Sequence, residues 1–206
     1  MGRRMDSRKD SQLNNLRLVL AQEAARLIRD HGIEDFRTAK SKAAERFGVR
    51  QYGALPSNLE IEQALAERNR IFGQDEHTSL LVSLRNVAVT VMYELQSFRP
   101  CLVGPVLSGN VTEHSVIDLH LFSDASENIG MQLHASGIRH NAVSRRHRMR
   151  HDHFEQYPGY RFFADEFEVQ ATVFPERRKG HAPLCPVNGR PMQRAGLRDV
   201  ESLALA

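Results

Sequence analysis

The sequence predicts an α+β fold, with N-terminal helices followed by a small mixed β-sheet that carries helices on one face. Two observations lead to this prediction. Up to about residue 99, apolar residues recur at the three- and four-residue spacing of amphipathic helices. From Pro100 onward, short runs that are β-branched-rich or alternate between apolar and polar residues are separated by glycine-containing turns, which is typical of strands. A helical half followed by strands and a helix favours one sheet covered by helices.

The first half is expected to hold four helices: over residues 12–31, over 37–47, from a cap at Ser57 to a stop at Gly73, and over 76–98. Ser57 and Glu60 form a capping-box pattern at the start of the third, because each side chain can bond the backbone N–H of the other. The fourth helix is the most apolar and should be the most buried. We therefore divide this half into a flexible basic tail, residues 1–11, and a helical region, residues 12–99. The sequence leaves open whether these helices form a separate domain, although packing on the core of the sheet is expected.

Residues 100–206 are expected to form the α+β domain, with a loop-rich C-terminal tail. Strands are predicted at 102–107, 116–122 and 138–150, and a helix at 125–136. A hairpin is predicted over 160–174, with its turn near Asp165. The stretch 176–196 is rich in Pro, Gly and Arg and predicts loop, before a short helix at about 197–205.

Composition places the chain among globular proteins, with 41% hydrophobic and 26% charged residues. No run approaches the roughly 20 apolar residues that span a bilayer, so no membrane partner is expected. The N-terminal charges have no apolar segment behind them, which argues against a secretory signal. Cys101 and Cys185 lie far apart and favour free thiols in a reducing compartment. We therefore expect a cytoplasmic protein.

One stretch has the character of a nucleotide site. Ser108-Gly109, a short polar loop and then Ser115-Val116-Ile117-Asp118-Leu119-His120-Leu121 resemble the core of the DNA polymerase β-type nucleotidyltransferase superfamily. In that superfamily a Gly-Ser or Ser-Gly turn ends a strand, the next strand carries an Asp-hydrophobic-Asp pair, and a later strand supplies a third carboxylate. The resemblance covers roughly residues 102–174. It implies a nucleotidyltransferase-like fold that uses Mg²⁺ and takes an NTP as substrate.

The spacing of the acidic pair has a physical reason. Residues two apart on a strand point to the same side, so two carboxylates can together hold two Mg²⁺ ions about 3.5–4 Å apart. The resemblance implies catalytic roles for Asp118 and Glu168, and metal ligation by Asp118, His120 and Glu168. If Ser115 aligns with the serine of the superfamily, Val116 stands in the place of the first carboxylate. Gln170, two residues after Glu168, would be a neutralised remnant of the third.

Other residues are candidates for binding phosphate. A glycine turn lets backbone N–H groups approach a triphosphate closely. The residues expected to hold it there are Ser108, Gly109 and Ser115. The densest basic segment is 144–153, and as a strand it would place Arg146, Arg148 and Arg150 on one side, as a phosphate track for a nucleotide or RNA. The alternative is an edge strand protected from pairing by its charge.

The wider sequence, including residues 104–109 and 182–192, also resembles a group of short proteobacterial proteins, some of which are named UDP-N-acetylmuramate–alanine ligase. An ATP-dependent ligase of that kind needs a phosphate loop similar to G-x-x-G-K-[ST], which this sequence lacks. Two hypotheses follow. The first is a Mg²⁺-dependent enzyme that moves a nucleotide from an NTP to an unknown acceptor. The second is a catalytically inactive descendant that binds a nucleotide, RNA or a protein.

Overall fold

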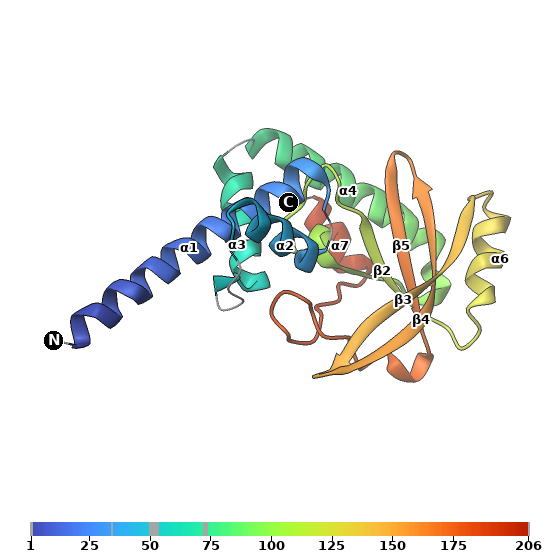
Figure 1. The fold of residues 1–206 in the computed structure, drawn as a ribbon. Coiled ribbons are helices and arrows are strands. Elements are labelled where there is room, and N and C mark those ends of the chain that lie inside the picture. The colour runs from blue at the N-terminus through green and yellow to red at the C-terminus, as the bar shows by residue number, and fades with distance from the viewer. Residues whose placement is uncertain (1, 34, 50–53, 72–73, 206) are drawn as a thin grey trace. The chain divides into compact units, whose positions relative to one another are not determined.

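The computed structural model describes residues 2–33, 35–49, 54–71 and 74–205, and divides the chain into two compact units (Figure 1). The helical unit comprises residues up to Gln74 together with Thr112–His114 and Pro186–Asn188. The sheet unit comprises Asp75–Val111, Ser115–Cys185 and the residues from Gly189 on. The division lies some 25 residues before the expected change at residue 99, so the fourth helix belongs with the sheet.

The helical unit contains α1 (Gly2–His31), α2 (Phe36–Arg46) and α3 (Asn58–Ile71). The first helix begins ten residues earlier than the predicted start at residue 12. Small and branched apolar side chains of α1 pack against α2 and α3 and form a core of their own, with Leu20, Ala24 and Ile61 fully buried. Of the four helices expected to pack on the core of the sheet, α1, α2 and α3 form this separate core, whereas the fourth helix packs on the sheet.

Side-chain caps fix the starts of α2 and α3. Asp35 accepts a hydrogen bond from the backbone N–H of Thr38 at 2.9 Å, which satisfies one donor of the first turn of α2. Ser57 Oγ accepts from Glu60 N at 3.1 Å, and Glu60 Oε2 accepts from Ser57 N at 2.6 Å. The predicted capping box is thus confirmed.

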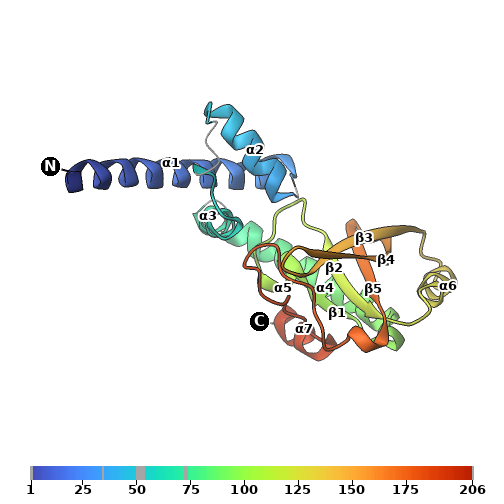
Figure 2. The same cartoon turned by 60° about the horizontal axis from the view of Figure 1, so that its bottom comes forward.

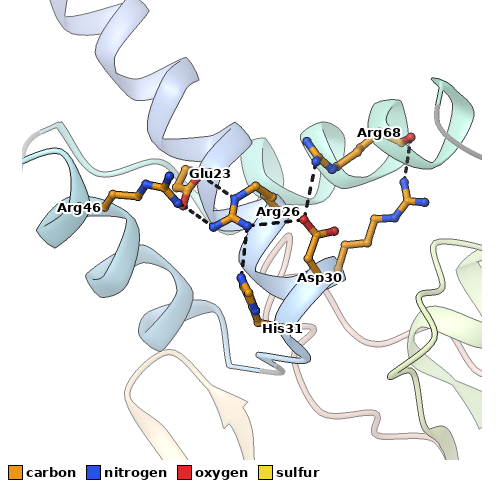
Figure 3. Close-up of polar contacts among 7 residues, drawn as sticks. Glu23, Arg26, Asp30, His31, Arg46 and Arg68 are labelled. Carbon is orange, nitrogen blue, oxygen red and sulfur yellow. Dashed lines mark hydrogen bonds and ion pairs between the residues drawn. The ribbon is translucent and has the colours of Figure 1, made fainter.

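Two carboxylates of α1 join the three helices of this unit (Figure 3). Glu23 is 9% exposed and accepts hydrogen bonds from Arg26 and from Arg46 of α2. The hydrogen bond from Arg26 lowers the pKa of Glu23 below its usual value. Asp30 pairs with Arg26 at 3.6 Å and with Arg68 of α3 at 3.8 Å. The buried end of this network is where removal of a charge would cost most.

In the sheet unit, the described residues form one mixed sheet with the strand order β1-β2-β5-β4-β3. The strands are β1 (Cys101–Val103), β2 (Ile117–Phe122), β3 (His140–Arg150), β4 (His153–Ala164) and β5 (Phe167–Phe174). β2 and β5 are parallel, and the other neighbouring pairs are antiparallel. The structure therefore confirms the α+β class, and it confirms the hairpin turn near Asp165, whose φ of 50° is left-handed.

One face of this sheet is covered by helices (Figure 2). They are α4 (Gln74–Glu94), α5 (Gly104–Ser108), α6 (Glu127–Ala135) and α7 (Leu197–Ala204), with short 3₁₀ turns at Gln96–Phe98 and Glu176–Arg178. Alternate residues of the strands point into this core, and the central ones are fully buried: Ile117, Leu119, Leu121, Val169, Ala171 and Val173. No helix within the described ranges has the length and apolar character needed to cross a bilayer.

The predicted strand at 102–107 was wrong beyond Val103. Gly104 takes a φ of +72°, and Pro105 stands in the first turn of α5, where its fixed φ suits a helix. The Ser108-Gly109 turn consequently ends a short helix, whereas the resemblance expected it to end a strand.

Candidate functional site

The face of the sheet opposite the helices carries polar side chains at its centre, and we call it the polar face. Strand register places Asp118 of β2 opposite Gln170 of β5, and Gln170 opposite Arg161 of β4. Arg161 is in turn opposite Asn141 of β3. Because side chains alternate along a strand, the residues that share this face are Asp118, His120, Glu168, Gln170, Thr172, Arg161, Arg145 and His147.

A guanidinium stands at the centre of this face. Arg145 Nη2 donates to Asp118 Oδ1 at 3.1 Å, and Arg145 Nη1 donates to Gln170 Oε1. Gln170 Nε2 donates onward to Glu168 Oε1 at 2.9 Å. The Asp118 and Arg145 side chains are each 23% exposed. One arginine therefore links the candidate catalytic aspartate to the strand of the candidate third carboxylate.

This contact also shows how the sheet is bent. Arg145 lies on β3, which is separated from β2 by β5 and β4 in the strand order. Across a flat sheet the two strands would lie roughly 14 Å apart, at about 4.8 Å per strand. The register also places Asn141 level with Asp118, so Arg145, four residues further along β3, would be displaced by about another 13 Å along the strands. Contact between Arg145 and Asp118 therefore requires the sheet to curl, which makes the polar face concave, with β3 and β4 bending over β2 (Figures 1 and 2).

Gly159 of β4, which lies beside this arginine, allows β4 to approach β5 closely. A Cβ at Gly159 would lie 2.4 Å from the backbone oxygen of Ala171 on β5 and 3.5 Å from Cγ of Arg145. The first distance is one that real Cβ atoms do not adopt, so any side chain here would push β4 from β5. The absence of a side chain thus permits the close strand contact, while Arg145 lies at an ordinary van der Waals distance from this position.

His120 is buried beside this network and is neutral. It is 1% exposed, and its Nδ1 accepts a hydrogen bond from Arg194 Nε at 3.0 Å. Burial, followed by the charge of Arg194, lowers the pKa of His120 well below its usual value. Since Nδ1 accepts, the proton of the neutral ring is on Nε2. The lone pair that could bind a metal at Nδ1 is already used.

His147 of β3 is the second buried imidazole of the polar face. Its ring meets that of His120 edge to face, with centroids 5.6 Å apart, and its Nε2 lies 3.1 Å from Thr172 Oγ1. Burial and the charge of Arg145 lower the pKa of His147 to about 4. Both histidines are therefore uncharged near neutral pH.

A C-terminal segment crosses the polar face. Leu184 N donates to Arg148 O at the edge of β3, and Leu102 N of β1 donates to Ala195 O at the opposite edge of the sheet. Between these anchors, Arg194 places its guanidinium 5.0 Å and 5.2 Å from the ring centres of Phe122 and Phe174. This cation–π geometry fixes Arg194 against the face and so holds the hydrogen bond to His120.

The glycine next to the aspartate is Gly104. A Cβ at Gly104 would lie 3.3 Å from Asp118 Oδ2. Gly109 instead lies beside Leu81 and Arg85 of α4. Of the other residues expected to hold a triphosphate, Ser108 is exposed, with its hydroxyl 3.3 Å from Pro105 O, and Ser115 lies two residues before β2. The predicted phosphate-binding turn is thus at the far end of α5 from Asp118.

The predicted phosphate track is divided between the two faces. Arg146 and Arg148 alternate with Arg145 and so lie on the opposite face from Asp118, where the Arg146 guanidinium stands 4.1 Å above the ring of Phe154. The register shifts between Arg148 and Arg150, which interrupts the alternation. Arg145 was the arginine of this segment that sequence reasoning missed, because its face depends on the register with β4.

The donor set does not fit two Mg²⁺ ions. Among the described residues, no three His, Cys, Asp or Glu side chains converge to hold a metal. Asp118 is paired with Arg145, His120 is occupied by Arg194, and Glu168 is joined to Asp118 only through Gln170 and Arg145. Magnesium prefers several free hard oxygen ligands in near-octahedral geometry, which this arrangement does not offer.

The site must be interpreted from its own geometry, since no protein-family model, curated protein or solved structure matches the chain. It offers a concave face with one bridged carboxylate, neutral imidazoles and several guanidinium groups. Donors of this kind suit the binding of an anionic oxygen-rich ligand more than proton transfer or metal-assisted chemistry.

Proposed function

We propose that the chain is a nucleotidyltransferase-like protein that binds a nucleotide on the polar face and does not transfer it. The observation that carries the proposal is the pairing of Asp118 with Arg145, whose guanidinium also bonds Gln170. In the superfamily that the motif resembles, carboxylates in these positions would hold metal ions. Here a side-chain cation occupies the same surroundings.

A guanidinium supplies part of what a metal would supply. It is permanently charged, and its planar fork matches the oxygens of a phosphate group. It does not, however, lower the pKa of a bound hydroxyl or clamp two oxygens for in-line displacement as paired metal ions do. Nucleotide binding without transfer is the behaviour expected of such a site, and it should not require Mg²⁺.

The groups around the pair suit a phosphate ligand. The Arg161 side chain is 52% exposed and lies 4.0 Å from Glu168, a distance too long for a strong bond, so it can turn toward a ligand. Gly104 leaves the space beside Asp118 Oδ2 free of a side chain. An incoming phosphate would share Arg145 with Asp118 and take Arg161 from Glu168.

The active enzyme remains the second candidate, because one observation favours it. Asp118 and Glu168 lie on the same face of neighbouring parallel strands, one side-chain repeat, or about 7 Å, apart in register. If a bound NTP drew Arg145 onto its phosphates, the Asp118 carboxylate would be released. The two candidates therefore differ in whether substrate binding creates a metal site.

Calorimetry with ATP in Mg²⁺ and in EDTA tests the proposal, alongside incubation with labelled NTPs, Mg²⁺ or Mn²⁺, and cellular RNA or protein. We expect ATP to bind equally well in both buffers, to bind at least several-fold more weakly to Arg145→Gln, and to leave no transferred label. Arg146→Gln is the matched control, since it removes the same charge from the opposite face of β3. Label transfer that Asp118→Asn abolishes would establish the enzyme instead. Absence of any ATP binding would refute both.

A further inference from the structure

A second concave feature lies at the far end of the polar face, where the β3–β4 hairpin meets the segment after β5. It is a cavity of about 650 Å³, within the range of small-molecule sites. Its walls are partly apolar, from Met149, Leu184 and Pro191, and partly basic, from Arg150, Arg178 and His181. This combination suits a ligand with an apolar body and an anionic end.

The cavity is separate from the Asp118 network. Between the two lies a small apolar cluster in which Phe122, Tyr157 and Phe174 are buried and Met149 packs against them. Tyr157 is opposite Arg145 in the β3–β4 register, and Glu155, the next residue on the same face, lines the cavity. A ligand in the cavity would thus lie beyond the apolar cluster from Asp118.

Glu155, the carboxylate in the cavity wall, is already paired with an arginine. Both carboxylate oxygens of Glu155 accept from Arg178 Nη2 at 2.9 Å, and Oε2 also accepts from the Tyr157 hydroxyl at 2.6 Å. His153 Nε2 lies 3.3 Å from Glu155 Oε1. The hydrogen bond from Tyr157 lowers the pKa of Glu155, so the carboxylate stays charged and keeps Arg178 in place. It therefore positions a cation and adds little repulsion toward an anion.

Two basic side chains of the cavity wall, Arg150 and His181, make no side-chain contact of this kind within the described residues. Within the part of the chain that the structure describes, neither the Arg150 guanidinium nor the His181 imidazole has a hydrogen bond or ion pair with another residue. The register shift after Arg148 is what interrupts the alternation of β3 and lets Arg150 line the cavity beside Met149. Both side chains are exposed, so they can exchange water for an anion in the cavity that they line.

We propose that this cavity binds a phosphomonoester that has an apolar body. Arg150 and His181 would hold the phosphate, Arg178 would add charge from its anchored position, and Met149, Leu184 and Pro191 would contact the apolar part. A phosphate group offers three acceptor oxygens, so it can engage Arg150, Arg178 and His181 together better than a carboxylate with two oxygens can. The site is additional to the nucleotide site proposed above and does not depend on it.

Titration of the full chain with phenyl phosphate, followed by calorimetry or protein-observed NMR, tests the proposal. Phenyl phosphate should bind saturably, and more tightly than inorganic phosphate, benzoate or benzyl alcohol, because it alone joins an apolar body to a phosphate group. Arg150→Gln should weaken it about tenfold, as expected for the loss of one charged hydrogen-bond donor, and His181→Gln several-fold. Arg146→Gln, on the same strand but the opposite face, should leave it unchanged.

The outcomes that overturn the proposal are equally definite. Equal affinity for phenyl phosphate in wild type and Arg150→Gln would place the ligand elsewhere. If Arg150→Gln and Arg146→Gln lose the same affinity for phenyl phosphate, the loss comes from the change in net charge and not from the cavity. Binding of benzyl alcohol as tight as that of phenyl phosphate would show that the basic wall is not used. Because Arg150 is exposed, Arg150→Gln should melt at the wild-type temperature, so weakened binding can be assigned to the cavity.

Discussion

Arg145 donates a hydrogen bond to Asp118 at 3.1 Å, although the strands of these two residues are not neighbours in the sheet. The contact depends on the curl of the sheet, and Gly159, which lets β4 approach β5 closely, lies beside Arg145. It makes the polar face concave, and it occupies the carboxylate on which a metal-dependent mechanism would rely. The Arg145–Asp118 contact therefore bears on both the chemistry of the site and the shape of the sheet.

The strength of this pair can be measured by a double-mutant cycle. Asp118→Asn, Arg145→Gln and the double variant are compared by urea denaturation. Because both side chains are 23% exposed, we expect a coupling free energy of about 1 kcal/mol, between that of surface pairs and that of buried ones. The control cycle uses Glu67 and Arg70 of α3, which are 55% and 69% exposed and should couple more weakly than Asp118 and Arg145. Equal coupling in the two cycles would mean that Asp118 and Arg145 are in effect solvated.

The glycine beside Asp118 has a testable role. Gly104→Ala should destabilise the protein because φ is +72° and because the new Cβ would meet Asp118 Oδ2 at 3.3 Å. Gly137→Ala is the matched control, with φ of +71° and no atom within 4 Å. Both variants carry the backbone cost of about 1 kcal/mol, so an additional loss for Gly104→Ala reports the contact with Asp118. If the two variants unfold at the same temperature, the Asp118 carboxylate can move aside to accommodate the new Cβ.

Gly159 should be far less tolerant. Gly159→Ala would bring a Cβ to 2.4 Å from the backbone oxygen of Ala171, which no side-chain rotation can relieve. We expect a loss of about 3 kcal/mol in the free energy of unfolding, the upper end of the range typical of an overpacked core. Gly180→Ala, where nothing lies within 4 Å, should be nearly neutral. A small effect at Gly159 would show that β4 and β5 are not held as closely as described.

Stability should also depend on pH through His147. Its pKa is lowered to about 4 in the folded protein by burial and by the charge of Arg145, while an unfolded histidine titrates near its usual value. Between about pH 6.5 and pH 4 the unfolded chain binds a proton that the folded one does not, so stability is full above this window and falls as the pH drops. The slope is at most about 1.4 kcal/mol per pH unit for this group.

Replacing this histidine should flatten the profile. Between about pH 4 and 6.5, His147→Gln should lower the slope of the free energy of unfolding against pH by the contribution of roughly one proton. The contribution of His120 should remain. Melting curves across this pH range decide the matter. An unchanged slope in His147→Gln would mean that His147 is solvated in the folded state.

Most secondary structure could be predicted from local signals, because the interactions that determine it are between residues close in sequence. The Ser57 and Glu60 box, the period of α4 and the turn at Asp165 each depend on residues close in sequence. The error at 104–107 has the same kind of cause. Val106 and Leu107 read as strand residues, but Pro105 after a left-handed Gly104 favours the first turn of a helix.

The site was less accessible to sequence reasoning, because it depends on register and on curl. Asp118 could be identified as costly to bury without a partner, but nothing local distinguishes Arg145 from Arg146. The choice between them follows from the pairing of β3 with β4, which places Arg145 opposite Tyr157. Arg194 lies in a segment that reads as loop, and its contact with His120 spans 74 residues.

The most direct test of the central claim is one calorimetric titration of ATP into wild type, performed in Mg²⁺ and in EDTA, and paired with a label-transfer assay on the same sample. If a guanidinium has taken the place of the metal, the two binding curves coincide and no label is transferred. Binding that requires Mg²⁺, together with transfer that Asp118→Asn abolishes, would contradict the account.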